Sequence, residues 1–134
     1  MISERRRAKI KIIELILKGR PITKKNSQII ALTKNGRRYV IQSPQYCAYE
    51  KDCLQQIKYL YRVETIIGNV SLQALYYMPT KFRPDLTNLL QATADILEKA
   101  RVIENDKNIV SFDGSRIGGI DKSNPRTEII IEGR

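Results

Sequence analysis

The chain has 134 residues, enough for one domain that buries about two-thirds of the surface its unfolded form exposes. Its 24 lysines and arginines outnumber its 14 aspartates and glutamates, and the resulting net charge of +10 favours a polyanionic partner such as nucleic acid. The sequence has no histidine, which excludes a histidine-containing zinc finger, a Cys–His nucleophile and a serine triad. Catalysis would therefore depend on carboxylates, lysines or a metal held by oxygen ligands.

The first third of the chain predicts three strands. Alternating residues at the start of Ile10–Leu17 favour a strand, and a basic loop follows over Pro21–Ser27. Two short β-prone runs, Gln28–Thr33 and Arg38–Gln42, flank an Asn-Gly step, which is a strong hairpin signal. The sequence thus predicts a strand, a loop and then a hairpin.

Two helices are expected in the middle of the chain. Ser43 is a good N-cap with a proline at the first helical position after it, and the apolar spacing downstream predicts a helix over about Pro44–Tyr61. Strict alternation over Asn69–Met78 predicts a strand with one buried face. Apolar residues at helical spacing then predict a second helix over Leu86–Ala100.

The last third of the chain predicts two more strands. We expect a polar turn over Val102–Asp106, a strand over Ile109–Ile117 and a final strand over Thr127–Glu132. The glycine pair at 118–119 is expected to break the chain between these strands. The order β-β-β-α-β-α-β-β describes an α+β domain, in which a mixed β-sheet carries two main helices packed on it.

The cysteine pattern and the hydropathy limit the class of protein further. Cys47 and Cys53 lie in the first predicted helix, where six residues rise ~9 Å, beyond the Cα separation that a disulfide tolerates. The apolar runs are too short for a membrane helix, which needs ~20 residues, and the arginine-rich start lacks the pattern of a signal peptide. We therefore expect a cytoplasmic single domain over residues 1–134 with two free cysteines, and a flexible basic tail over residues 1–8.

Polar residues mark one side of the second predicted helix. At helical spacing Asp85, Asn88 and Asp95 share a stripe away from the leucine face. The later turn with Glu104 and Asp106 can fold back beside the start of this stripe. Acids gathered in this way repel one another unless a cation lies between them. Mg²⁺ suits such a site because it takes one or two carboxylates with waters and phosphates, and it promotes phosphodiester hydrolysis.

Each of these acids also has a structural interpretation. Asp85 directly precedes a helix, where aspartate is a good N-cap. Asp95 could be solvated or paired with a lysine, and Glu104 and Asp106 could serve the turn through local hydrogen bonds. Spacing alone leaves both the metal site and these structural roles open.

Clustered positive charges predict contacts with phosphates. Such contacts make binding strongly salt-dependent and carry little sequence information. Two of the clustered lysines, at positions 24 and 25, are also compatible with ordinary loop charges. The residues expected to hold the DNA backbone are Lys24, Lys25, Arg37, Arg38, Lys81 and Arg83.

These motifs resemble the RusA family of Holliday-junction resolvases, in the form found in phages and prophages. That family has a basic N-terminal loop, an Asp-x-Asp-Asn-Leu element that opens a helix, and a later acidic pair. Here the element reads DLTNL at residues 85–89, with Asn88 and the leucine after it matching, and the later acidic turn ends in Asp106. The resemblance spans most of the chain, from about residue 10 to residue 132.

The resemblance implies a homodimer that binds four-way DNA junctions and cuts them in pairs, as an endonuclease of DNA recombination and repair. It implies Mg²⁺ as cofactor, with Mn²⁺ as an alternative ion. It implies no small-molecule cofactor and no membrane partner. Asp85 and Asp106 carry over as catalytic metal ligands. Asp95 carries over as a helix acid near the site, and either Asp95 or Glu104 would complete the metal shell.

Two positions depart from the family pattern. The second aspartate of the element is Thr87, whose hydroxyl brings no charge, and the family's catalytic lysine one turn further on is Gln91. Glu104 could supply the missing acid, and a loop cation such as Lys24 or Arg83 could supply the missing positive charge. Two other functions therefore stay open: an impaired family member that binds junctions or other nucleic acid without cutting, and a basic fold that acts on RNA or binds a protein partner.

Overall fold

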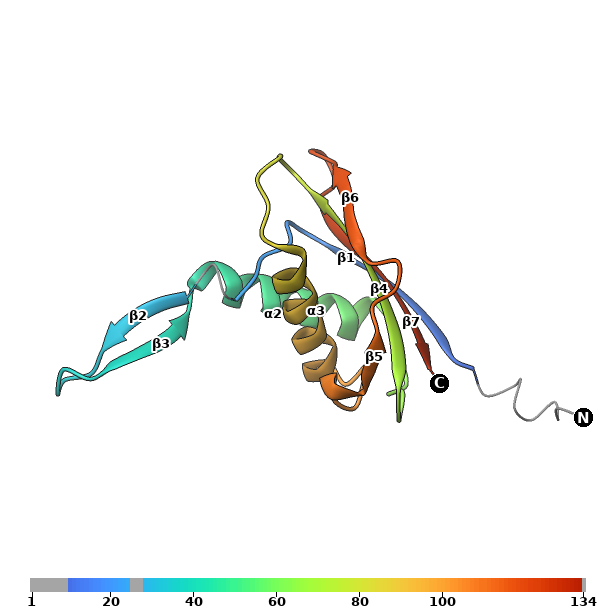
Figure 1. Ribbon diagram of the computed structural model, residues 1–134, viewed down its shortest axis with the longest axis horizontal. Coiled ribbons are helices and arrows are strands. Elements are labelled where there is room, and N and C mark those ends of the chain that lie inside the picture. The colour runs from blue at the N-terminus through green and yellow to red at the C-terminus, as the bar shows by residue number, and fades with distance from the viewer. Residues whose placement is uncertain (1–9, 25–27, 134) are drawn as a thin grey trace, which may run out of the picture.

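The centre of the molecule is one mixed β-sheet (Figure 1). The computed structural model describes residues 10–24 and 28–133. The strands of the sheet are β1 (Ile12–Lys18), β4 (Val70–Met78), β5 (Ile109–Ser111), β6 (Arg116–Ile120) and β7 (Arg126–Gly133). Strand β7 pairs antiparallel with β1 and β4, whereas β5 and β6 both pair parallel with β4. The predicted mixed sheet is therefore confirmed.

Strand β4 lies in the middle of the sheet, paired on both edges, and its apolar residues alternate. Val70, Leu72, Ala74, Tyr76 and Met78 are each at most 1% exposed, while the residues between them are only partly buried. Alternate residues of a strand point to opposite faces of the sheet. One face of β4 is thus wholly apolar and needs a covering layer.

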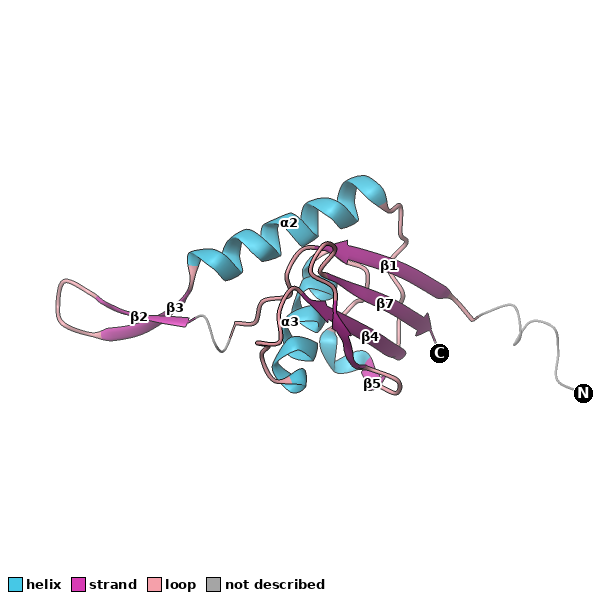
Figure 2. Cartoon of the chain, turned by 90° about the horizontal axis from the view of Figure 1, so that it is seen from above, coloured by secondary structure: helices cyan, strands magenta, loops and turns pink. Residues whose placement is uncertain are grey.

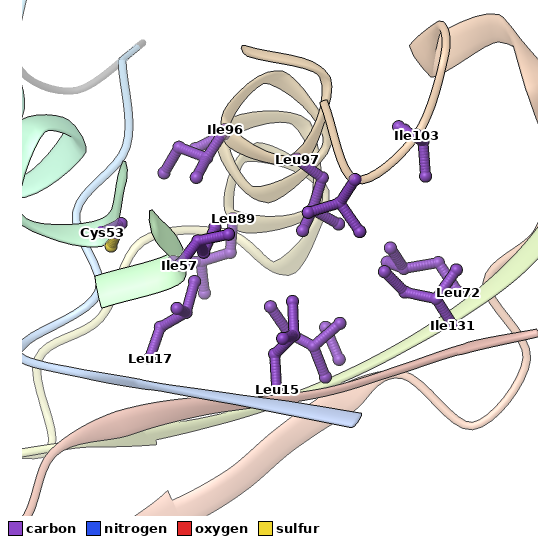
Figure 3. Close-up of a cluster of buried hydrophobic side chains, with 14 of the residues drawn as sticks. Leu15, Leu17, Cys53, Ile57, Leu72, Leu89, Ile96, Leu97, Ile103 and Ile131 are labelled. Atoms are coloured by element: carbon purple, nitrogen blue, oxygen red, sulfur yellow. The ribbon is translucent and has the colours of Figure 1, made fainter. Parts of the chain in front are cut away.

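Two helices, α2 (Pro44–Leu60) and α3 (Leu86–Lys99), cover that face. Figure 3 shows Ile57 of α2 and Leu97 of α3 in the same buried cluster as Leu15 of β1. Because both helices contribute to one core, the α+β fold with two helices on a mixed sheet is confirmed. Neither helix is both long and apolar enough for a membrane span, among the residues that the structure describes.

The start of α2 follows from its sequence. The hydroxyl of Ser43 accepts a hydrogen bond of 3.2 Å from the backbone N–H of Tyr46, and Pro44 occupies the first helical position. Both are standard features of a helix N-terminus. Within this helix Cys47 is exposed and Cys53 is buried, and both are free, as predicted.

The predicted hairpin is present as a sheet of its own. Strands β2 (Gln28–Leu32) and β3 (Arg38–Gln42) pair antiparallel, and Figures 1 and 2 show them extending away from the rest of the molecule. At the turn, the backbone N–H of Gly36 donates to the carbonyl of Thr33 at 3.0 Å. Gly36 has φ +80°, which glycine adopts at little cost.

The C-terminal third differs from its prediction in two ways. The single strand expected over residues 109–117 is divided into β5 and β6 by a turn, in which the backbone N–H of Ser115 donates to the carbonyl of Phe112 at 2.9 Å. Gly118 and Gly119 lie inside β6 instead of ending a strand. The expected polar turn after α3 is also partly wrong, because its first two residues, 102 and 103, are fully buried.

Gly118 is the extra residue at a register shift in β6, where Ile117 and Gly119 pair with consecutive residues of β4, and an aromatic ring lies against it. A Cβ atom at this position would lie 2.6 Å from Cζ of Tyr77, closer than real Cβ contacts come. The guanidinium of Arg126 lies over the same ring, 4.0 Å from the ring centroid. Arg126 in turn pairs with Asp121 and Glu128, at 2.8 Å each. The glycine thus leaves room for a ring that Arg126 holds in place.

We expect Gly118→Ala to lower the free energy of unfolding by about 1–3 kcal/mol, because the added methyl group must displace the Tyr77 ring. Urea denaturation monitored by circular dichroism measures this change. The matched control is the same substitution in a Tyr77→Ala background, where the cost should vanish. An equal cost in both backgrounds would contradict the role given to the ring.

Candidate functional site

A hollow of about 380 Å³ lies between one side of α3 and the segment that follows it. Thr87, Gln91 and Ala94 lie along the α3 wall, spaced by four and three residues, so they share one face of the helix. Asp106 and Lys107 form part of the opposite wall, in the short 3₁₀ helix η2 (Asp106–Asn108). The complete lining is Thr87, Leu90, Gln91, Ala94, Asp106, Lys107, Ile109 and Phe112.

Two hydrogen bonds hold the start of η2, and one of them joins it to α3. The backbone N–H of Asp106 donates to Oε1 of Glu98 at 2.9 Å, which ties the start of η2 to the last turns of α3. The side chain of Asn105 caps η2 by accepting from the backbone N–H of Lys107 at 3.0 Å. Asp106 is therefore held by its backbone, and the residue forms part of the wall of the hollow.

Asp85 is the N-cap residue of α3, with φ −65° and ψ 144°. Its backbone carbonyl accepts from the N–H groups of Asn88 and Leu89, both at 3.1 Å. Its side chain makes no capping hydrogen bond, however, and the residue is exposed. The carboxylate is therefore not used in the capping role that its position alone would suggest.

Asp95 lies further around α3 and pairs with a lysine. Nζ of Lys24 lies 2.9 Å from Oδ2 of Asp95, and the two side chains are 29% and 19% exposed. The side-chain amide of Gln91 donates to Oδ1 of Asp95 at 3.4 Å. Lys24 also lies 5.8 Å from the ring centroid of Tyr46 on α2. One carboxylate thus joins the loop after β1 to the helix face that borders the hollow.

Tyr46 belongs to a polar cluster between the two helices. Its hydroxyl donates to Oε2 of Glu50 at 3.1 Å, and Nζ of Lys99 donates to Oε1 of the same carboxylate at 2.8 Å. Burial, followed by the nearby Glu50 charge, raises the pKa of Tyr46 well above its ordinary value. The tyrosine stays protonated across the physiological range, so it remains a hydrogen-bond donor that helps to fix α2 against α3.

The structure brings some of the predicted site residues together and leaves others apart. Thr87, Gln91 and Asp106 line one hollow, but Asp85, Asp95 and Glu104 are not among its described lining residues. Within residues 10–24 and 28–133, no group of three or more Asp, Glu or Cys side chains is arranged as a metal cluster. Asp106 is the acidic residue among the described residues that line the hollow. Thr87 and Gln91, the two positions that differ from the motif, line the same hollow.

The predicted phosphate contacts occupy two exposed regions and one partly buried ion pair. Arg37 and Arg38 are exposed at the end of the β2–β3 hairpin, and Lys81 and Arg83 are exposed in the loop before α3. Lys24 is the member held in the ion pair with α3, and the residue after it, Lys25, lies outside the described residues. The exposed members of this predicted set thus lie at the hairpin turn and in the loop before α3.

Sequence reasoning missed one residue that lines the hollow and one that positions its wall. Glu98 holds η2 in place, and Lys107 places a cation directly beside Asp106. The adjacent acid–lysine pair at 106–107 was a signal for the second of these residues. Glu98 gave no such signal, because its role depends on where η2 packs.

Comparison with known proteins shows which family the sequence is similar to. The family model described as "Endodeoxyribonuclease RusA" matches residues 18–132. A relative, the crossover junction endodeoxyribonuclease RusA of Aquifex aeolicus (strain VF5), is 29% identical over 94 residues, which cover 70% of this chain and 71% of the relative. The matched range includes both helices and every described residue of the hollow.

Proposed function

This chain belongs to the RusA family of endodeoxyribonucleases, and from that membership we propose that it resolves four-way DNA junctions by paired phosphodiester cuts. The observation that carries the proposal is the hollow in which Thr87, Gln91 and Asp106 meet, because these are motif positions from two separate segments. The relative named as a crossover junction endodeoxyribonuclease supports the same substrate. The net charge of +10 suits a DNA ligand.

Mg²⁺ is the cofactor that we propose for this reaction, with Mn²⁺ as an alternative ion. The donors in the hollow are oxygens from a carboxylate, a hydroxyl and an amide, on Asp106, Thr87 and Gln91. This donor set fits Mg²⁺, which uses one or two carboxylates and fills its other positions with waters and substrate phosphate. When bound, such an ion activates water and neutralises charge on the attacked phosphate.

We assign the central catalytic role to Asp106, as the ligand that would hold the ion. Asp85 is the second proposed ligand, because its carboxylate is exposed at the start of α3 and is not used for capping. Glu104 is a further candidate ligand, exposed two residues before Asp106, although Nδ2 of Asn108 donates to it at 3.5 Å. Lys107, Lys81 and Arg83 would hold the phosphates on either side of the cut.

Asp95 acts in this proposal through Lys24 and is not a ligand of the metal. The ion pair keeps a cation close to Gln91, the position where the family pattern has its catalytic lysine. We infer that Lys24 supplies part of the positive charge that Gln91 lacks. Asp95 is then a positioning residue, because it holds the lysine against α3.

We expect Asp95→Asn and Lys24→Ala each to reduce junction cleavage about tenfold, because either change releases the same cation; tenfold corresponds to about 1.4 kcal/mol in the barrier. The double variant should reduce the cleavage rate no more than either single variant does, since both substitutions remove the same ion pair. Cleavage rates at saturating Mg²⁺ and the Mg²⁺ concentration for half-maximal rate measure the two effects. A large rise in that Mg²⁺ concentration for Asp95→Asn alone would show that Asp95 is instead a metal ligand.

The active species that we propose is a homodimer. A four-way junction has two-fold symmetry, so paired cuts need two equivalent sites at a fixed spacing. A dimer with one hollow on each protomer meets that requirement. Sedimentation of the purified chain together with its junction complex gives the number of protomers that bind.

A second function, binding of junctions without cutting, is favoured by one observation. Asp106 is the sole carboxylate among the described residues that line the hollow, since Thr87 and Gln91 replace charged groups of the family pattern. The two functions are separated by incubating the protein with an end-labelled four-way junction, with and without Mg²⁺. Paired nicks placed symmetrically about the branch point support the nuclease, whereas a stable complex with intact strands supports the binding protein.

A further inference from the structure

We propose that the β2–β3 hairpin selects branched DNA, through apolar side chains that contact the exposed base pairs at the branch point. The basic turn of the hairpin would hold the neighbouring phosphates. This inference rests on the proposed junction substrate and adds to it the element that distinguishes a junction from a linear duplex. It does not depend on whether the protein cuts.

The hairpin carries exposed apolar side chains on both of its faces. Ile30 and Leu32 are 66% and 65% exposed, and Tyr39 and Ile41 are 46% and 40% exposed. In the antiparallel register Leu32 lies opposite Arg38, and Ala31 lies opposite Tyr39. The first two apolar residues therefore share one face, and the second two share the other. An isolated two-stranded hairpin is marginally stable in water and gains stability when its apolar side chains pack against another surface. A bound ligand would supply that surface.

The charge around the hairpin favours a polyanion over a protein as that ligand. No acidic residue occurs between Glu14 and Glu50 in the sequence. The basic residues of this interval are Lys18, Arg20, Lys24, Lys25, Lys34, Arg37 and Arg38. All fourteen acids of the chain therefore lie elsewhere, while the hairpin turn is flanked by cations. Interleaved cations and apolar or aromatic groups are the pattern by which proteins hold unstacked nucleic acid.

The base of the hairpin lies near the segment that leads into the DLTNL element. A second hollow, of about 330 Å³, is lined by residues 20–23 before the hairpin, by Ser43 just after β3, and by Pro84. Pro84 directly precedes Asp85 at the start of α3. Figure 1 shows the hairpin leading into the start of α2, and the hollow at its base reaches Pro84, the residue before the DLTNL element. At ~3.3 Å per residue, the turn of the hairpin can reach roughly 20 Å from that base.

The apolar side chains of the hairpin can select junctions because the free-energy cost of inserting them between bases differs between a continuous duplex and a branch point. Inserting side chains such as Leu32 and Tyr39 into a continuous duplex requires unstacking, which costs a few kcal/mol for each base step. At a branch point the stack is already interrupted, so the same contact is made without that cost. The basic residues at the turn contribute equally to both DNA forms, since phosphate contacts are insensitive to sequence and branching.

The test measures binding in the absence of divalent metal, so that no strand is cut. The protein is titrated with a labelled four-way junction and with a linear duplex of the same arm sequence. The hairpin variant is Leu32→Ser with Tyr39→Ala, and its matched control is Tyr59→Ala, a 74% exposed tyrosine at the end of α2. We expect the hairpin variant to lose at least tenfold in junction affinity and to keep its duplex affinity within twofold, while the control changes neither.

A charge variant, Arg37→Gln with Arg38→Gln, should weaken both complexes alike. It should also reduce the slope of log K against log salt by about 1.8, or about 0.9 for each phosphate that is no longer neutralised. Equal losses of affinity for junction and duplex in the apolar variant would overturn the proposal. So would a loss of dimer in sedimentation, because the hairpin would then be a protein interface. Selective junction binding by a wild-type protein that makes no cuts would refute the nuclease and leave this inference intact.

Discussion

Replacing Asp106 with asparagine is expected to reduce junction cleavage at least about 100-fold, which corresponds to about 2.7 kcal/mol in the activation barrier. The carboxylate belongs to the one hollow in which α3 and η2 bring motif residues together, within the part of the chain that the structure describes. Asparagine keeps the size of the side chain but removes the negative charge that would hold Mg²⁺. The backbone N–H of residue 106 can still donate to Glu98, so the site should keep its shape.

Cleavage of an end-labelled junction, followed over time at several Mg²⁺ concentrations, measures this effect. Asp113→Asn is the matched control, because Asp113 is an exposed aspartate in the turn between β5 and β6. The control should cut at the wild-type rate, and both variants should bind the junction with unchanged affinity. A cutting rate for Asp106→Asn within threefold of wild type would remove Asp106 from the mechanism.

Restoring the family pattern at its two departures is expected to increase cleavage at least about tenfold. Thr87→Asp adds a second carboxylate to the wall that faces Asp106, and Gln91→Lys adds a cation one turn further along α3. The added acid should lower the Mg²⁺ concentration needed for half-maximal cutting, since two carboxylates hold the ion more tightly than one. The added lysine should increase the rate at saturating Mg²⁺.

The double variant Thr87→Asp with Gln91→Lys should therefore show both changes. Both positions are exposed, so neither substitution is expected to alter the fold. Tyr59→Lys is a control for added charge at an exposed helix position outside the site. If the double variant cuts no faster than wild type at any Mg²⁺ concentration, the hollow beside α3 is not where the reaction occurs.

Local patterns in the sequence were enough to predict most of the fold. The alternation in β4, the Asn-Gly step in the hairpin and the Ser43 cap of α2 are local signals, and each is present in the structure as predicted. The division between β5 and β6 lies at the turn of residues 112–115, whereas Gly118, which looks like a chain break, lies inside β6. Gly118 lies there at a register shift against β4, a strand from a distant part of the chain, and local sequence does not indicate that pairing.

The site was less predictable because its geometry depends on long-range packing. The DLTNL element was enough to predict that α3 carries the motif, but Asp95 has a partner, Lys24, that lies seventy-one positions earlier in the chain (95 − 24). The position of η2 depends on the hydrogen bond from Asp106 to Glu98. Contacts of this kind join residues that are far apart in the sequence, so the helical or strand periodicity of the sequence does not predict them.

The most direct test of the proposed function is the pattern of cuts in a four-way junction that carries a label on each strand in turn. With wild-type protein and Mg²⁺, we expect nicks at symmetric positions on two opposite strands, with no cutting of the linear duplex and none without metal. Intact strands under every metal condition, despite stable binding to the junction, would contradict the nuclease and identify the chain as a family member that binds junctions without cutting them.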